Sequence, residues 1–157
     1  MTKYIMLIIV LGLIISFFVR NNANGETAKA NAVQATEFLQ ANKQLEGVIE
    51  TSSGLQYQVL TPGQGETHPM GRSKVKVHYH GTLLDGSVFD SSVERDEPIS
   101  FGLNQVIKGW TEGLQLMVVG EKTRLFIPAK LAYGNNKTGK IPPGSLLIFD
   151  VELLAIN

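Results

Sequence analysis

The chain contains no cysteine in its 157 residues. This absence excludes disulfide bonds, thiol catalysis, cysteine-based metal sites and the lipid-carrying cysteine of a lipoprotein anchor. It is compatible with an oxidising compartment and does not by itself indicate one. Neither sign of charge is in excess, because 14 basic residues balance 14 acidic residues. The composition therefore gives no indication of nucleic acid or of an acidic surface as a partner.

Repeats and nucleotide-binding motifs are also missing from the sequence. There is no internal repeat, and the Gly-Gln-Gly segment at residues 63–65 lacks the third glycine of a dinucleotide-binding loop. Of the three histidines, His78 and His80 lie two apart on a predicted strand, and His68 lies in a predicted loop. Because no further ligands are placed beside them, we expect neither a metal ion nor any other cofactor.

A long apolar run is present near the N-terminus. Lys3 is followed by an almost wholly apolar segment over residues 4–19, which Arg20 closes. A helix over this run would span about 24 Å, short of a hydrocarbon core of roughly 30 Å, and the flanking basic side chains would extend its reach. Residues 1–20 are therefore predicted to be an inner-membrane anchor with the remaining chain in the periplasm. The alternative is a cleaved signal segment that releases a soluble periplasmic protein.

Residues 21–47 have the composition of a linker. Residues 21–31 are rich in Asn, Ala, Gly and Thr, which is typical of a flexible tether. A few larger apolar residues follow at helical spacing and predict one short helix that ends near Gly47. These residues are Val33, Phe38, Leu39 and Leu45. Such a helix has too little apolar surface to be stable alone, so we expect a docking or spacer element.

The stretch VKVHYHGTLLDGSVFD, residues 75–90, predicts a β-hairpin. Apolar and polar residues alternate in its first half, so the first strand has one apolar face. Asp85-Gly86 supplies the turn, and the second strand ends in Phe89 and Asp90. A carboxylate beside a large apolar ring has to be solvated, hydrogen-bonded or paired. If Tyr79 converges with this pair, the three residues form an apolar cavity with a polar contact, as in a small-ligand site.

The patterns elsewhere predict a sheet and one helix. Further strands are predicted at residues 55–59, 99–101, 123–127 and 146–154. An amphipathic helix is predicted over residues 104–116, with Asn104 as its N-cap. The fold class is therefore α+β, with about five antiparallel strands wrapped around one amphipathic helix in residues 48–157.

Several sequence blocks then occur in a characteristic order and spacing. They are Leu55-Gln56-Tyr57, VHYHGTLLDGSVFDSS, QVIKGWTEGLQLM, GEKTRLFIP, LAYG and IPPGSLLIFDVELL. Together, over residues 48–157, they resemble an FK506-binding-protein (FKBP) type peptidyl-prolyl cis/trans isomerase. The helix that precedes a Gly-Leu-Gln-Tyr strand is similar to the bacterial infectivity-potentiator and FkpA-like branch. Members of that branch carry a longer N-terminal helical dimerisation arm, in the place of which this chain has the apolar run, so an oligomer is not required.

The resemblance implies an isomerase of X-Pro bonds in unfolded or nascent polypeptides, and macrolides of the FK506 class as inhibitors. The residues that it carries over as catalytic are Tyr79, Asp90, Trp110 and Tyr133. The residues that it carries over as substrate-binding are Phe89, Arg95, Ile99, Val106, Ile107, Ile141 and Phe149. Trp110 would be the floor under the proline ring, Tyr133 would offer its hydroxyl to a substrate carbonyl, and Arg95 would pair with Asp90.

Two places depart from the family pattern. Ile99 stands where many relatives have an aromatic wall residue. The loop over residues 135–140 is short and polar, and it carries Lys137 and Lys140 where such a loop often carries apolar or histidine contacts. We therefore expect Ile99 to loosen one side of the pocket, and the sequence leaves open the preference for residues that flank the proline.

Each of these residues also has a simpler structural interpretation. The apolar residues and the tyrosines fit ordinary packing, and Asp90 fits a turn cap before two serines. Two function classes stay open: an active prolyl isomerase, and a proline-binding chaperone or scaffold module with little turnover. The complete set of aromatic and polar residues favours the isomerase, because a pocket without turnover has no need of its polar members.

Overall fold

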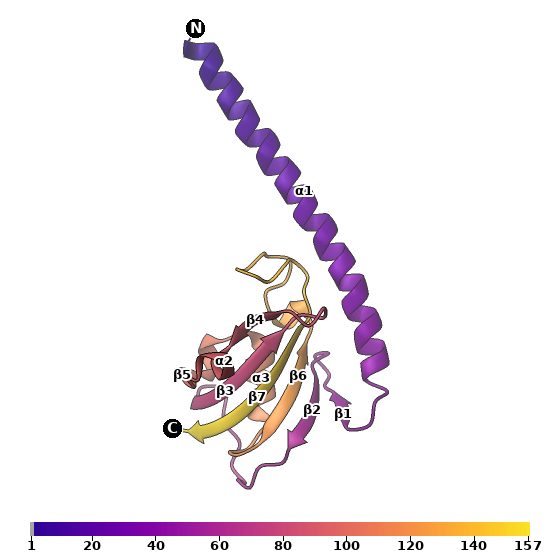
Figure 1. Cartoon of the computed structure of the whole chain (residues 1–157), viewed down its shortest axis with the longest axis vertical. Coiled ribbons are helices and arrows are strands. Elements are labelled where there is room, and N and C mark those ends of the chain that lie inside the picture. The colour runs from indigo at the N-terminus through magenta and orange to yellow at the C-terminus, as the bar shows by residue number, and fades with distance from the viewer. Residues whose placement is uncertain (1) are drawn as a thin grey trace.

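The computed structural model describes the backbone of residues 2–157 and the side chains from residue 13 onwards. One antiparallel sheet carries the fold, and the helix α1 (Thr2–Asn42) runs along one side of it and extends beyond it (Figure 1). The strands are β1 (Val48–Glu50), β2 (Gln56–Thr61), β3 (Lys74–Thr82), β4 (Val88–Ser91), β5 (Ile99–Gly102), β6 (Lys122–Ile127) and β7 (Leu147–Ile156). The shorter helices are α2 (Ser92–Arg95), α3 (Lys108–Gln115) and two 3-10 turns, Leu103–Gln105 and Ala129–Leu131.

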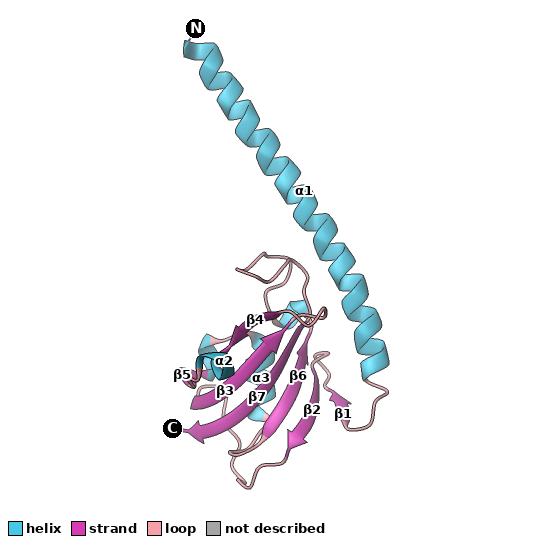
Figure 2. Cartoon of the chain, viewed as in Figure 1, coloured by secondary structure: helices cyan, strands magenta, loops and turns pink. Residues whose placement is uncertain are grey.

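The strands are ordered β1-β2-β6-β7-β3-β4. The C-terminal part of β3, residues 80–82, pairs with β4, and its N-terminal part, residues 74–77, pairs with β5. The C-terminal strand β7 thus lies in the middle of the sheet, where alternate residues from Leu147 to Leu153 are buried. Figure 2 shows α3 lying against one face of this sheet. The α+β prediction is confirmed. The sheet has seven strands where about five were expected. The strand that no sequence pattern indicated is β1, which is only three residues long and too short to show an alternating pattern.

The predicted hairpin of residues 75–90 is confirmed as β3 and β4. The Leu83 N–H donates to the Ser87 carbonyl at 2.9 Å, and Gly86 has a φ of 84° in the turn between the strands. The Asp85 carboxylate accepts the Ser87 N–H at 2.9 Å. The turn therefore uses the conformational freedom of glycine and the short polar side chain that the sequence indicated.

The amphipathic helix begins later than predicted. Residues 103–105 form a 3-10 turn, Val106 is extended (φ −120°, ψ 174°), and α3 begins at Lys108. The residue at the N-cap is Ile107, which makes no side-chain cap, so the prediction of Asn104 as N-cap is wrong. Instead, the Thr111 hydroxyl reaches back from the first turn of α3 to the Leu103 carbonyl at 2.6 Å. This hydrogen bond stabilises the N-terminus of α3, which has no side-chain cap.

Helix α1 is continuous through the residues predicted as a flexible tether, so the prediction of a tether at residues 21–31 is wrong. The C-terminal half of the helix packs against the sheet, with contacts to β2 and β6. Ala28, Ala35 and Asn42 are buried at intervals of seven residues, the spacing that returns to one face of a helix. Asn42 Nδ2 donates to the buried Gln56 side chain at 2.9 Å. The docking element is therefore longer than predicted and uses small and polar residues.

The predicted anchor or signal segment falls mainly on residues 4–12, whose side chains lie outside the described residues. From residue 13 to residue 19 the large apolar side chains of α1 are exposed. In the part of the chain that the structure describes, no helix is both long and apolar enough to span a membrane.

Candidate active site

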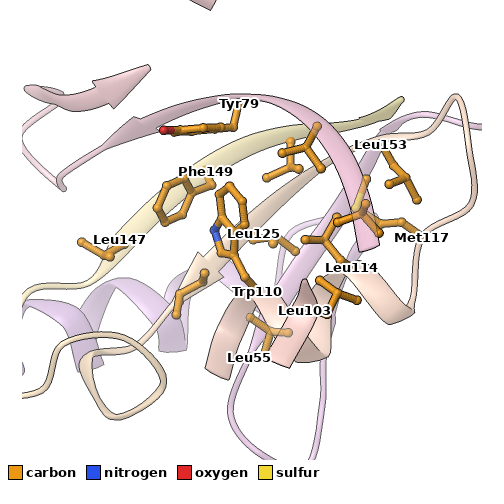
Figure 3. Close-up of a cluster of buried hydrophobic side chains, with 14 of the residues drawn as sticks. Leu55, Tyr79, Leu103, Trp110, Leu114, Met117, Leu125, Leu147, Phe149 and Leu153 are labelled. Atoms are coloured by element: carbon orange, nitrogen blue, oxygen red, sulfur yellow. The ribbon is translucent and has the colours of Figure 1, made fainter. Parts of the chain in front are cut away.

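A cavity of about 610 Å³ opens at one end of the hydrophobic core, between α3, the sheet and the loop after residue 133. Figure 3 shows the core beside it, where Tyr79, Phe149 and Trp110 lie next to one another. The lining is mostly aromatic and aliphatic. It consists of Tyr79, Phe89, Asp90, Ile99, Phe101, Gln105, Val106, Ile107, Trp110, Tyr133, Thr138, Gly139, Lys140, Ile141 and Phe149. A concave, largely apolar surface of this size suits a small ligand or a short peptide segment.

Trp110 is at the centre of the aromatic part of this cavity. Its ring centroid lies 5.1 Å from those of both Tyr79 and Phe149, in edge-to-face geometry, and 5.3 Å from that of Phe101. Phe89 packs edge-to-face on Phe149 at 5.3 Å. Such contacts are favourable beyond the burial of area and hold each ring in one orientation. The aromatic wall of the cavity is therefore packed in place without a ligand.

Two glycines make room for this arrangement. A Cβ atom at Gly81 would lie 2.7 Å from the Phe89 ring and 2.8 Å from the Phe149 ring. A Cβ atom at Gly109, in the first turn of α3, would lie 2.4 Å from the Ile127 side chain. The missing side chains let the rings cross β3 and let α3 approach β6 closely. Both approaches are needed to place Trp110 under the cavity.

Asp90 is the acidic group of the cavity, and it has two partners. The Tyr79 hydroxyl donates to one carboxylate oxygen and Arg95 forms an ion pair with the other. A second Arg95 nitrogen donates to the Tyr79 hydroxyl oxygen at 3.2 Å. Burial opposes ionisation of Asp90, but the hydrogen bonds from Tyr79 and Arg95 outweigh it and lower the Asp90 pKa below 3.8. Burial, reinforced by the hydrogen bond to Asp90, raises the pKa of Tyr79 above 10.0.

The Trp110 indole N–H is buried at the cavity floor. Among the side chains from residue 13 onwards, its Nε1 is the one buried polar atom without a hydrogen-bond partner. A buried donor without an acceptor costs about 1–3 kcal/mol, so such a donor is uncommon in a native core. The floor of the cavity therefore carries a polar group that core packing alone does not require.

The structure brings together ten of the eleven residues predicted for the site. The remaining one, Arg95, does not line the cavity and reaches it through its ion pair with Asp90. The lining residues that were missed are Phe101, Gln105, Thr138, Gly139 and Lys140. Alternation along β5 places Phe101 on the same side as Ile99, and this signal was available in the sequence. The histidines at positions 78 and 80 do not line the cavity.

The charge state of the cavity is expected to be independent of pH between about pH 5 and 9, where Asp90 stays ionised and Tyr79 stays protonated. The same lowered pKa means that the contribution of Asp90 to stability is present at neutral pH and is lost on acidification below 3.8. Rates on an X-Pro peptide, the substrate that the resemblance implies, measured without a coupling protease across this range, check the expectation. A rate that changes with an apparent pKa near 6.5 would instead implicate a histidine.

A sheet that wraps around one short helix and holds an aromatic cavity at their junction defines an FKBP-type domain. The chain belongs to the FKBP-type peptidyl-prolyl cis-trans isomerase family, whose family model matches residues 65–154. A second family model, the domain amino terminal to FKBP-type peptidyl-prolyl isomerase, matches residues 15–59. The chain therefore carries at least part of the family's amino-terminal domain, in the region where the apolar run was expected to stand in its place.

Similar proteins are found among the FkpA proteins, as the resemblance predicted. FkpA of Aeromonas hydrophila is 57% identical over 130 residues, which are 83% of this chain and 48% of that protein. The FKBP-type 22 kDa peptidyl-prolyl cis-trans isomerase of Escherichia coli strain K12 is 50% identical over 129 residues, 82% of this chain and 62% of that protein. The crystal structure of FkpA from Escherichia coli matches with a TM-score of 0.85 at 40% identity, over 94% of this chain and 71% of that one. The chain thus spans about half to two thirds of the length of these curated relatives.

Proposed function

We propose that this chain accelerates cis/trans rotation about X-Pro bonds in unfolded or nascent polypeptides, by a non-covalent mechanism in the aromatic cavity. The observation that carries the proposal is the combination of the buried Trp110 floor with the paired carboxylate of Asp90 at the same cavity. Family membership and the FkpA relatives support the same reaction class.

The chemistry of the reaction explains why such a cavity is suitable. An X-Pro bond rotates over a barrier of roughly 20 kcal/mol in tens of seconds, because amide resonance is lost in the twisted state. No nucleophile is needed. The twisted amide is less dipolar than the planar one, so an apolar, water-poor wall disfavours the ground state more than the transition state. Each 1.4 kcal/mol of this difference is about tenfold in rate.

We assign the roles within the cavity accordingly. Trp110 supports the pyrrolidine ring, and the walls of Tyr79, Phe89 and Phe149 exclude water. The hydroxyl of Tyr133 and the backbone N–H of Ile107 bind substrate carbonyls. The carboxylate of Asp90 is the polar contact that faces the twisting imide and removes no proton, because the reaction transfers none. Macrolides of the FK506 class would compete for the same surface.

The full-length chain in a protease-coupled assay on a Xaa-Pro peptide tests the proposal. A rate above the thermal background that saturates with the peptide supports it. Trp110 is the single tryptophan of the chain, so its fluorescence reports directly on occupancy of the cavity. Peptide binding by fluorescence without any added rate would contradict the isomerase and indicate the proline-binding module instead.

Replacing Tyr133 with phenylalanine is expected to lower kcat/KM by roughly 2- to 10-fold, the value of one neutral hydrogen bond in the transition state. The side chain is 38% exposed, so the melting temperature should not change. Tyr57→Phe is the matched control, because Tyr57 packs on the core and does not line the cavity. Equal rates for wild type and Tyr133→Phe would remove the hydroxyl from the mechanism.

We further propose that the chain acts outside the cytoplasm, and the apolar run over residues 4–19 supports this location. Membrane attachment through this run and release by signal cleavage make different predictions for the mature protein. Fractionation combined with intact-mass measurement distinguishes them. The small residues of Ala23-Asn24-Gly25 and Ala28-Lys29-Ala30 have the spacing that a signal peptidase recognises. A mature chain in the soluble periplasmic fraction that begins just after one of them, near Glu26 or Asn31, would overturn the anchor.

A further inference from the structure

The charges at the cavity are unequally compensated. Two charged residues line it, Asp90 and Lys140. Asp90 is in an ion pair with Arg95, whereas Lys140 has no carboxylate within ion-pair distance among residues 13–157. The acidic residues that follow Asp90 along the chain, at positions 94, 96 and 97, do not line the cavity. The cavity therefore presents one uncompensated charge to a ligand, and that charge is positive.

The backbone of Lys140 is held in a tight turn. Thr138 and Ile141 exchange two backbone hydrogen bonds, of 3.0 and 2.8 Å, around the two-residue loop Gly139–Lys140. Gly139 has a φ of 53°, as glycine does at the first position of such loops. Ile141 is itself buried in the cavity wall. The position from which the Lys140 side chain extends is thus fixed relative to the aromatic floor.

The surrounding chain braces this loop from the other side. The Gly144 N–H donates to the Gly134 carbonyl at 2.8 Å and closes the base of the loop. Asn31 of α1 donates to the Pro143 carbonyl at 2.8 Å. A Cβ atom at Gly144 would lie 2.5 Å from the Ala28 carbonyl oxygen, so α1 is in close contact with the loop base. Helix α1 and the domain together therefore position the loop that carries Lys140.

We propose that Lys140 gives the cavity a preference for X-Pro bonds that have an acidic residue next to the proline. This inference rests on the proposed function. A proline ring above Trp110 has neighbouring Cα atoms about 3.8 Å along the chain. The flexible stem and ammonium group of a lysine on the cavity wall can reach a carboxylate on such a neighbour. Lys137 lies on the same loop and does not line the cavity, so it lacks this access.

The effect is that of an exposed ion pair. A Glu-Pro or Pro-Glu peptide is expected to react about 1.5- to 5-fold faster than its Gln counterpart, the range that surface ion pairs provide. The ratio should decrease as ionic strength rises, because salt screens exposed charges. A Lys side chain at the same peptide position should be disfavoured by a similar factor, since two ammonium groups then repel each other.

The test uses the full-length chain and peptides with Glu, Gln, Lys or Leu directly before or after the proline, in a protease-free assay of kcat/KM. The wild type should show the Glu-over-Gln ratio on at least one side of the proline. Lys140→Gln should bring that ratio to one, and Lys140→Glu should invert it in favour of the Lys peptides. Lys137→Gln is the matched control: it removes one positive charge from the same loop and should keep the ratio.

Three results would overturn the inference: a wild-type ratio of one, a ratio that survives in Lys140→Gln, or a ratio that is lost equally in Lys137→Gln. The last result would mean that the preference arises from the total positive charge of the loop and not from Lys140 in particular. Failure of the proposed function looks different, because no peptide, including the neutral Leu peptide, would then react. In that event the same ratios, measured as binding through Trp110 fluorescence, decide the charge preference by themselves.

Discussion

Replacing Gly109 with alanine is expected to lower the melting temperature by roughly 4–12 °C, the equivalent of about 1–3 kcal/mol of overpacking. The added methyl group would lie 2.4 Å from a side-chain carbon of Ile127, a fully buried residue of β6. Relief requires α3 to move away from the sheet, because Ile127 has no free space to enter. Since Trp110 is the next residue on α3, the cavity floor should move with it and the isomerase rate should fall as well.

A matched substitution gives the opposite sign. Gly25 lies in the exposed part of α1, where an added Cβ meets nothing within 4 Å. Gly25→Ala should therefore stabilise the helix by up to about 1 kcal/mol, the difference in helix propensity.

A double variant tests the steric explanation. In the Gly109→Ala background, Ile127→Ala removes the opposing carbons, so the double variant should lose less stability than the two single variants lose in sum. Strict additivity in thermal unfolding would contradict the steric explanation.

Most of the residues that line the cavity were predicted from the family resemblance, and local patterns by themselves pointed only to Tyr79, Phe89 and Asp90. Tyr79 alternates along a strand and Trp110 repeats on a helix face, so periodicity places each of them on an apolar face. That the two faces meet at one cavity was implied by the resemblance. Phe101 was missed although it obeys the same alternation, because its strand is only four residues long.

The docking of α1 could not be predicted in the same way. Its buried residues are Ala28, Ala35 and Asn42. Of the four apolar residues that suggested a helix, Val33 and Leu45 are exposed, whereas Phe38 and Leu39 are half-buried and the Phe38 ring packs on Phe126 at 5.8 Å. Small residues allow close approach, and Asn42 is buried only because Gln56 satisfies its amide. Both conditions depend on a partner surface 14 residues or more away along the chain. A search for large apolar residues at helical spacing therefore identified only part of the docking face.

The same limit applies to the loop after Tyr133. Residues 135–140 have the composition of a solvent-exposed turn, and composition does not show which turn residue faces a cavity. Gly139 and the paired backbone groups of Thr138 and Ile141 determine that Lys140 lines it. The aromatic floor is thus a property of regular elements, and the charge at the cavity is a property of one irregular turn. In the proposed mechanism, the reaction class and the substrate preference consequently depend on different parts of the fold.

Replacing Asp90 with alanine is expected to lower kcat/KM by about 10- to 100-fold, the value of a hydrogen bond to a charged group of about 1.5–3 kcal/mol. The side chains of Asp90 and Arg95 are 44% and 45% exposed, so the ion pair itself contributes at most about 1 kcal/mol to stability. The variant should therefore stay folded, with a melting temperature lowered by only a few degrees. A protease-coupled assay and thermal unfolding on the same preparation separate the two effects.

The chain offers a control in its other Asp–Arg ion pair. Arg124 Nε lies 2.6 Å from the carboxylate of Asp150, which does not line the main cavity. Asp150→Ala makes the same chemical change and should leave kcat/KM within about two-fold, since it removes no contact to substrate.

Arg95→Gln then tests how Asp90 acts, because it removes the cation and keeps the carboxylate. If Asp90 contacts the imide itself, Arg95→Gln should lower the rate far less than Asp90→Ala. Equal losses would mean that the Asp90–Arg95 pair acts as a unit that positions Tyr79, and that the carboxylate does not contact the substrate.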